Sequence, residues 1–277
     1  MQRDEGRMKS AHSVLISLLR MLVCCAAISV GSTAFGQVSF TTDASDLWWN
    51  AAESGWGMQI VAEGDASFAT LFVYDAGGQP TFFTATLSLT TASTWSGDLY
   101  RTTGPHFGTA SFNPALVSLR KVGTLTFMRT NSDAATLQYS VDGVSVSTSV
   151  TRQTLRNDNY SGTYTTIVAI VASHCSNSAD NRAQTDSHVI TIAQMGNTMT
   201  LSGSFAHRAA CTYSGMYTQA GRVGAIGAPY TCADGDAGIM NFFELTRRPG
   251  MISGRLSGHS ISDACDYGGA FTGLLPF

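Results

Sequence analysis

The chain has 277 residues, of which 44% are hydrophobic and 13% are charged, and its formal net charge is −3. This apolar fraction is that of a globular protein with a core, and it excludes an intrinsically disordered chain. The sequence contains no run of basic residues, which argues against nucleic acid as a partner.

Residues 1–36 are predicted to be a signal peptide. Basic residues precede the apolar stretch 21–30, and the small residues Ala34 and Gly36 follow it, as at a cleavage site. A lipid anchor on Cys24 or Cys25 is the alternative, but the small residues that should precede a lipid-modified cysteine are missing. No other stretch approaches the ~20 apolar residues of a membrane-spanning helix. The sequence therefore predicts a secreted or periplasmic protein, with membrane association unlikely.

Residues 37–156 are predicted to form a first β-domain. Apolar and polar residues alternate on both sides of Asp142-Gly143, and this dipeptide between alternating runs predicts a two-residue hairpin turn. The turn would place Val141 opposite Val144 and Tyr139 opposite Val146. The strands expected in this domain are 57–63, 67–74, 81–89, 95–102, 123–129, 137–141 and 144–150.

Residues 157–277 are predicted to form a second β-domain, after a polar join at 157–160. A turn at Gly196-Asn197 would place Ile192 opposite Leu201. About eight short strands with turn signals between them indicate a closed meander barrel or a sandwich. The expected strands are 162–171, 188–194, 198–205, 211–219, 223–232, 238–246, 251–257 and 269–275. The predicted fold is all-β, with two antiparallel meander barrels or sandwiches of calycin-like type.

Four cysteines follow the predicted signal peptide, and all of them lie in the second domain. An even number of cysteines in an exported protein indicates disulfides. A two-residue turn at Gly221-Arg222 would place Cys211 opposite Cys232, within disulfide distance. Cys175 and Cys265 then pair by elimination, after the first strand of the domain and before its last. A metal site formed by Cys175 with His174 is the alternative, but paired metal-ligand spacing is missing.

The most distinctive segment is LWWNAAESGWG at 47–57, which holds three of the four tryptophans of the chain. FVYD at 72–75, GQP at 78–80 and SGDLYRTTGP at 96–105 follow it.

These motifs resemble a group of exported proteobacterial proteins with a WWN-x-x-ESGWG opening and a YD-x-x-G-x-P hairpin. The resemblance covers roughly residues 41–156. It departs at Phe82 and Phe83, where the group's pattern has a Trp-Tyr pair. What it implies is export in a Gram-negative bacterium and a β-fold. The group has no assigned activity, so the resemblance transfers no catalytic residue.

The aromatic residues of this region are the candidate ligand-binding site. One interpretation is architectural, with Trp56 closing a barrel end and Glu53 capping nearby amides. The other is a platform near a barrel mouth, on which a sugar or an apolar group stacks. The candidate set is Trp48, Trp49, Glu53, Trp56, Phe72, Tyr74, Phe82 and Phe83.

The sequence offers little for catalysis. Glu53, Asp75 and Asp98 are the candidate acids, but nothing fixes their separation, and Ser54 lacks the strand-to-helix context of a nucleophile elbow. The histidines are scattered without metal-pair spacing. We therefore expect no cofactor, no metal site and no catalytic residue.

The favoured function is that of an exported, non-enzymatic binding protein. Its partner would be a small molecule, a glycan or another exported protein. One alternative is an inhibitor or adhesin-like protein that binds its target through loops such as 173–186. Another is a secreted hydrolase acting on carbohydrate or polymer. A third is an outer-membrane barrel, which the two expected disulfides disfavour.

Overall fold

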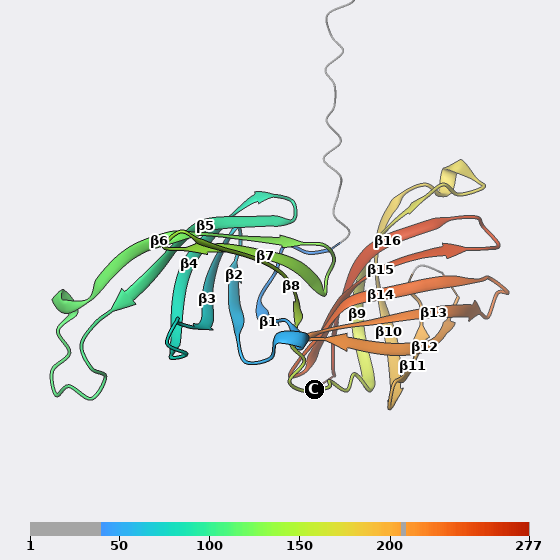
Figure 1. Ribbon diagram of the computed structural model, residues 1–277. Helices are drawn as coiled ribbons and strands as arrows, with labels where there is room; N and C mark the ends of the chain where they lie inside the picture. Colours follow the sequence, from blue (N-terminus) through green and yellow to red (C-terminus); the bar gives the residue numbers. More distant parts are fainter. Residues whose placement is uncertain (1–39, 206–208, 277) are drawn as a thin grey trace, which may run out of the picture. The chain divides into compact units, whose positions relative to one another are not determined.

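The structure is a computed structural model that describes residues 40–205 and 209–276 (Figure 1). The predicted signal peptide lies outside the described residues. Nearly all regular structure is β-strand, with three short 3-10 turns, η1 (Ala51–Glu53), η2 (Pro114–Leu116) and η3 (Ser178–Asp180). In this part of the chain no helix is long and apolar enough to cross a membrane.

The first eight strands close into an antiparallel barrel in which each strand pairs with the next in sequence and β8 pairs with β1. These strands are β1 (Asp46–Trp49), β2 (Gly57–Glu63), β3 (Ala66–Tyr74), β4 (Pro80–Thr91), β5 (Thr94–Thr103), β6 (Ser118–Arg129), β7 (Ala134–Val141) and β8 (Val144–Arg152).

The next eight strands repeat this up-and-down order, and β16 pairs with β9 to close a second barrel. These strands are β9 (Gly162–Ser173), β10 (Ala183–Met195), β11 (Thr198–Gly203), β12 (Cys211–Ala220), β13 (Val223–Cys232), β14 (Ala237–Arg248), β15 (Met251–Ser260) and β16 (Asp266–Leu274). The prediction of two antiparallel meander barrels is confirmed.

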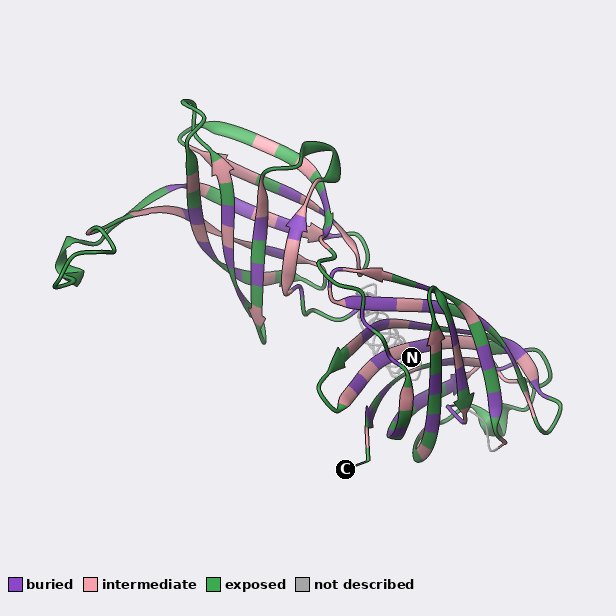
Figure 2. Ribbon diagram, turned by 90° about the horizontal axis from the view of Figure 1, so that it is seen from below, coloured by how far each residue is buried: buried purple, intermediate pink, exposed green. Residues whose placement is uncertain are grey.

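Both barrels are filled by their own side chains. Along most strands buried residues alternate with exposed ones, which Figure 2 shows as alternating purple and green bands. An eight-stranded barrel is just wide enough for inward side chains to fill it. The first interior packs residues such as Trp48, Trp95 and Phe127, and the second packs residues such as Tyr213 and Phe242. A ligand of this protein therefore has to be sought on outer faces and at barrel ends.

The turn chemistry predicted the strand registers correctly. Val141 lies opposite Val144 and Tyr139 opposite Val146, across the Asp142-Gly143 turn. Asp142 has φ 47° and Gly143 φ 88°, the left-handed conformation that this turn type requires. In the second barrel Ile192 lies opposite Leu201, as the Gly196 turn predicts.

Two local features differ from the predictions. Strand β1 was not expected, because its four residues are too short to show an alternating pattern; pairing with β2 and β8 creates it. The segment 173–186, expected to be a projecting loop, is partly strand, because its residues from Ala183 onward belong to β10 and pair with β9.

Two glutamine side chains hold the polar join before the second barrel: Gln194 bonds to the backbone of Asp158 and Tyr160, and Gln219 makes four further hydrogen bonds. The Gln219 amide donates to the carbonyls of Arg156 (2.9 Å) and Gly221 (2.8 Å). Its oxygen accepts from the amide of Asp158 (2.8 Å) and from the hydroxyl of Tyr217 (2.9 Å). Because the Gln219 amide bonds to the backbone of the join, the polar residues of the join pack against the second barrel.

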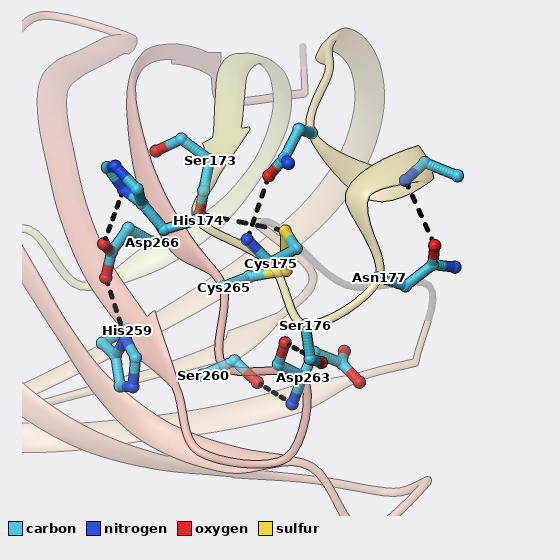
Figure 3. Close-up of a disulfide and its surroundings, with 12 residues drawn as sticks. Ser173, His174, Cys175, Ser176, Asn177, His259, Ser260, Asp263, Cys265 and Asp266 are labelled. Carbon is cyan, nitrogen blue, oxygen red and sulfur yellow. Dashed lines mark hydrogen bonds and ion pairs between the residues drawn. A yellow bond between two sulfur atoms is a disulfide. The ribbon is translucent and has the colours of Figure 1, made fainter.

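Two disulfides stabilise the second barrel, with the predicted pairing. Cys211 bonds to Cys232 across β12 and β13, and Cys175 bonds to Cys265. Figure 3 shows the second of these, next to the segment where Ser176 donates both its amide and its hydroxyl to the Asp263 carbonyl. Structural disulfides persist in oxidising compartments outside the cytoplasm. The protein is therefore exported.

Candidate functional site: an aromatic row on the first barrel

The tryptophan pair of β1 is divided between the two faces of the barrel wall. Trp48 points inward and is 0% exposed, with its ring 4.8 Å from that of Phe127. Its indole Nε1 donates to the carbonyl of Ala44 (2.9 Å), and the Arg152 guanidinium lies 4.6 Å from its ring centroid. Trp49, the next residue along an extended strand, faces outward and is half-buried. Trp48 is a core residue.

Trp49 begins a row of side chains that crosses the outer face of four strands. Since Trp48 pairs with Met58, Trp49 lies opposite Gly57 on β2. Gly57 pairs with Phe72 on β3, and Phe72 pairs with Phe82 on β4. Phe72 is 45% exposed and Phe82 48% exposed. The row thus presents three aromatic side chains and one gap, at Gly57, where a side chain is missing. We call these four residues the aromatic row.

Phe72 stands between two hollows in this surface. One has a volume of about 270 Å³ and is lined by Trp49, Trp56 and Gly57 among others. The other, of about 190 Å³, is lined by Tyr74 and Phe82 among others. Phe72 and Gly55 border both. The two hollows therefore adjoin each other and form one shallow groove along the aromatic row.

The ESGWG segment borders one end of this groove, and hydrogen bonds fix the position of the segment. Trp56 Nε1 donates to Glu53 Oε2 (3.1 Å), and the Tyr74 hydroxyl donates to the carbonyl of Gly55 (3.0 Å). Gly55 has φ 127°, a conformation that side-chain-bearing residues rarely adopt. Asn50 caps the preceding 3-10 turn by accepting from the Ala52 amide (3.0 Å).

The structure divides the predicted aromatic set into two groups. Trp48 and Phe83 are buried, at 0% and 3% exposure, so neither can contact a ligand. Burial follows from strand alternation, because Phe83 faces inward where Phe82 faces outward. Trp56 is half-buried and packs against the core. The exposed members of the candidate set lie on the outer wall of the first barrel, because side chains fill its interior.

On the side away from the ESGWG segment, the side chains next to the row are uncharged. On the same outer face, the neighbouring positions are Gln59, Thr70 and Thr84, which pair in register across β2, β3 and β4. Farther along, Phe68 and Val61 face each other and are both exposed. The row is therefore bordered by amide and hydroxyl groups on one side, and by a second apolar pair beyond them.

The three predicted acids serve local structure and do not converge. Glu53 accepts from Trp56, and Asp75 accepts from the amides of Gly77 and Gln79, both at 2.9 Å, within its own turn. Asp98 pairs with Lys121 at 2.7 Å. A cavity of about 900 Å³ at one end of the second barrel does gather carboxylates, which sequence reasoning missed because their loops are far apart in the chain. The carboxylates lining it are Asp180, Asp186, Asp234, Asp236 and Asp263.

Fold and surface together define a class: an exported protein of two closed β-barrels, with an exposed aromatic row on the first. No protein-family model and no curated protein matches the chain. Among solved structures it is similar to a Bacteroides fragilis crystal structure described as a “putative outer membrane protein”. The sequence identity is 13% and the TM-score 0.30, over 82% of this chain and 94% of that one. A likeness this distant assigns no function.

Proposed function

We propose that the protein is a secreted or periplasmic binding protein without enzymatic activity, and that the aromatic row holds a neutral glycan. The observation that carries the proposal is the gap at Gly57 between Trp49 and Phe72, two outward aromatic side chains with a hollow between them. Exposed aromatic groups beside a formed hollow are a common feature of ligand sites.

The spacing of the row suits one flat ring. Neighbouring strands lie about 4.8 Å apart, so Trp49 and Phe72, on strands two positions apart, leave roughly 9.5 Å between their backbones. Side chains stand roughly perpendicular to a sheet. A ring in contact with both aromatic faces needs about 3.5–4.0 Å on each side, or roughly 7–8 Å in total. A pyranose ring can therefore lie over Gly57 between the two side chains.

The chemistry of the surroundings favours a neutral sugar over a charged or a purely apolar ligand. The row and its neighbours Gln59, Thr70 and Thr84 carry no charge, so a charged ligand would lose hydration without a compensating ion pair. The amide and hydroxyl groups can both donate and accept hydrogen bonds, as sugar hydroxyls require. The weakly polar C–H faces of a sugar match the aromatic faces.

Binding to a panel of immobilised neutral oligosaccharides tests the proposal. Trp49→Ala and Phe72→Ala should each abolish retention of a bound glycan. Gly57→Val should do the same while leaving every aromatic residue in place, because it fills the gap. Phe68→Ala is the matched control, since it removes an exposed phenylalanine from the same strand but outside the row. Loss of retention in the control as well would contradict a site confined to the row.

A second candidate is a docking surface for another exported protein. The observation in its favour is that exposed apolar side chains extend beyond the row to Phe68, Val61 and Tyr74. A protein partner would use this wider patch, so Phe68→Ala would weaken its binding as strongly as Phe72→Ala. If neutral glycans bind and are also shortened, the protein is a hydrolase, and the carboxylates of the 900 Å³ cavity become the residues to substitute.

A further inference from the structure

The second barrel carries opposite charge at its two ends. In an up-and-down barrel successive turns alternate between the ends, so every second turn is at the same end. The turns at 233–236 and 261–265 bring aspartates to the 900 Å³ cavity. The turns after β12 and β14 are at the other end, and arginines gather there, although the sequence shows no basic run.

A cavity of about 580 Å³, which we call the arginine cavity, borders this second end, and Thr41, Asp43 and Arg152 from the first-barrel part of the chain also line it. Three acidic side chains also border it, so the lining arginines outnumber the acids by three. The arginines that line it are Arg152, Arg156, Arg222, Arg247, Arg248 and Arg255, and the acids are Asp43, Asp158 and Glu244.

The acids are already paired. Asp158 accepts from Arg156 at 2.8 Å, and Asp43 pairs with Arg222. Burial opposes the ionisation of Asp43, but hydrogen bonds from Ser45 and the Arg222 charge outweigh it and lower the pKa of its carboxyl.

Two further charged residues of the lining, Glu244 and Arg152, also have partners of opposite charge. Glu244 lies 3.5 Å from Arg129, a buried arginine outside the cavity lining, and accepts from the Thr41 amide. Arg152 is matched by Asp46 at 2.9 Å. No carboxylate of the lining is therefore left over for the remaining three arginines.

Those arginines are Arg247, Arg248 and Arg255, from the hairpin β14–β15. Within the described part of the chain none of them has a carboxylate partner. Arg255 lies 5.8 Å from the Phe243 ring centroid, a contact that orients the guanidinium without using its N–H groups. A hydrogen-bonded hydroxyl pair, Thr246 with Ser253 (2.8 Å), lies between them in the same lining.

We propose that the arginine cavity binds an organic phosphate with at least two negative charges. Guanidinium groups match phosphate oxygens in paired, charge-assisted hydrogen bonds. Three uncompensated arginines require a ligand with more than one charge. A cavity of 580 Å³ falls in the range of about 300–1,000 Å³ typical of small-molecule sites, so it has room for an organic group beside the phosphate. The proposal is independent of glycan binding by the first barrel.

Titration calorimetry of the intact protein with pyrophosphate tests the charge requirement. We expect saturable binding at low ionic strength that weakens as salt is added, because screening reduces attraction at an exposed site. Two further probes identify the source of the phosphate. Glycerol 1-phosphate represents a small soluble ester, and vesicles that contain phosphatidic acid, a lipid phosphomonoester, compared with vesicles of phosphatidylcholine alone, represent a lipid head group. Failure to bind pyrophosphate, the ester and the anionic vesicles at low salt would overturn the proposal.

Glutamine substitutions locate the site. Arg247→Gln, Arg248→Gln and Arg255→Gln should each weaken pyrophosphate binding about tenfold, the usual effect of losing a hydrogen bond to a charged group. Arg182→Gln is the matched control, because Arg182 is also an exposed arginine of the second barrel but lines the cavity at its other end. Unchanged affinity in the triple variant, with an unchanged thermal midpoint, would contradict the proposal. Trp49→Ala should retain full pyrophosphate affinity, which separates this result from the glycan test.

Discussion

The two barrels have the same strand order but are closed differently. In the first, β1 and β8 meet through two residue pairs, Trp48 with Arg152 and Trp49 with Thr151. In the second, β16 and β9 meet through nine pairs, from Asp266 with Ser173 onward, and the Cys175–Cys265 disulfide lies at one end of this junction.

Side chains supply what the short junction of the first barrel lacks. The buried Arg152 guanidinium donates to the carbonyls of Ser132 (2.7 Å) and Ser45 (2.9 Å), pairs with Asp46 and lies over Trp48. The tryptophan motif is therefore part of the closure of the first barrel. In the second barrel, backbone pairing between β16 and β9 and the Cys175–Cys265 disulfide close the barrel, so no tryptophan motif is needed there.

The two cores also differ in their aromatic chemistry. All four tryptophans of the chain are in the first barrel, whereas the second core buries tyrosines such as Tyr164, Tyr213 and Tyr230. Among the described residues, the fully buried core of the first barrel contains no tyrosine. Tryptophan fluorescence therefore reports on the first barrel alone, so each barrel can be followed separately.

Removing the disulfides should give the largest effect, and only on the second barrel. Cys175 and Cys265 are 90 residues apart in the chain, so replacing both with alanine should cost about 4–5 kcal/mol of unfolding free energy in the chain-entropy model. The Cys211–Cys232 bond closes a loop with a separation of 21 and should contribute about 3 kcal/mol. Urea unfolding followed by far-ultraviolet circular dichroism measures both changes. A tryptophan fluorescence transition that shifts equally would show that the barrels unfold as one unit.

Substitution of the tryptophan pair should give the next largest effect, now on the first barrel. Trp48→Ala should cost about 3–5 kcal/mol, because it empties a buried site at the barrel junction. Trp49→Ala should cost less than about 1 kcal/mol, since Trp49 faces outward. The midpoint of urea unfolding, followed by the fluorescence of the remaining tryptophans, compares the two variants. Equal, large losses would place Trp49 in the core and remove it from the aromatic row.

Alkaline pH should weaken the second barrel more than the first. Burial raises the pKa of Tyr217 and of Tyr267 to about 12, and also raises those of Tyr160, Tyr213 and Tyr230. The unfolded chain releases these protons from about pH 10 upward, while the folded barrel still holds them. Stability present below pH 10 is therefore lost as the pH rises above that value.

Thermal unfolding at a series of pH values, followed by tyrosinate absorbance, checks this expectation. The first barrel has one tyrosine with a raised pKa, Tyr139, where burial is again the main cause. Its fluorescence-detected transition should shift less over the same pH range. A larger shift in the first barrel would contradict the assignment of the buried tyrosines.

The smallest effects should come from two exposed carboxylates that form ion pairs, Asp142 on the first barrel and Asp266 on the second. A hydrogen bond from Arg120 lowers the pKa of Asp142, and hydrogen bonds from His259 and then His174 lower that of Asp266. Any stability from these carboxylates is present above about pH 4 and lost as the pH falls through their lowered values. Because the pairs are solvated, Asp142→Asn and Asp266→Asn should leave the thermal midpoint at neutral pH nearly unchanged. A clear drop in either variant would show that the pair has a structural role.

Much of the fold followed from local chemistry in the sequence. Asp142-Gly143 and Gly196-Asn197 each set a register, and the turn at Gly221-Arg222 placed Cys211 opposite Cys232, because a tight turn fixes which residues face each other along both strands. Strand alternation likewise predicted that Phe82 and Phe83 point to opposite faces.

The sites depended on how the strands pair with one another, which no single segment of the sequence specifies. Trp49, Gly57, Phe72 and Phe82 become one row only when β1 to β4 take their register, and Trp48 is buried because β1 pairs with β8. The arginines at 156, 222 and 247–255 are scattered in the chain. They meet because alternate turns of a meander return to the same end of the barrel once the strands between them have paired.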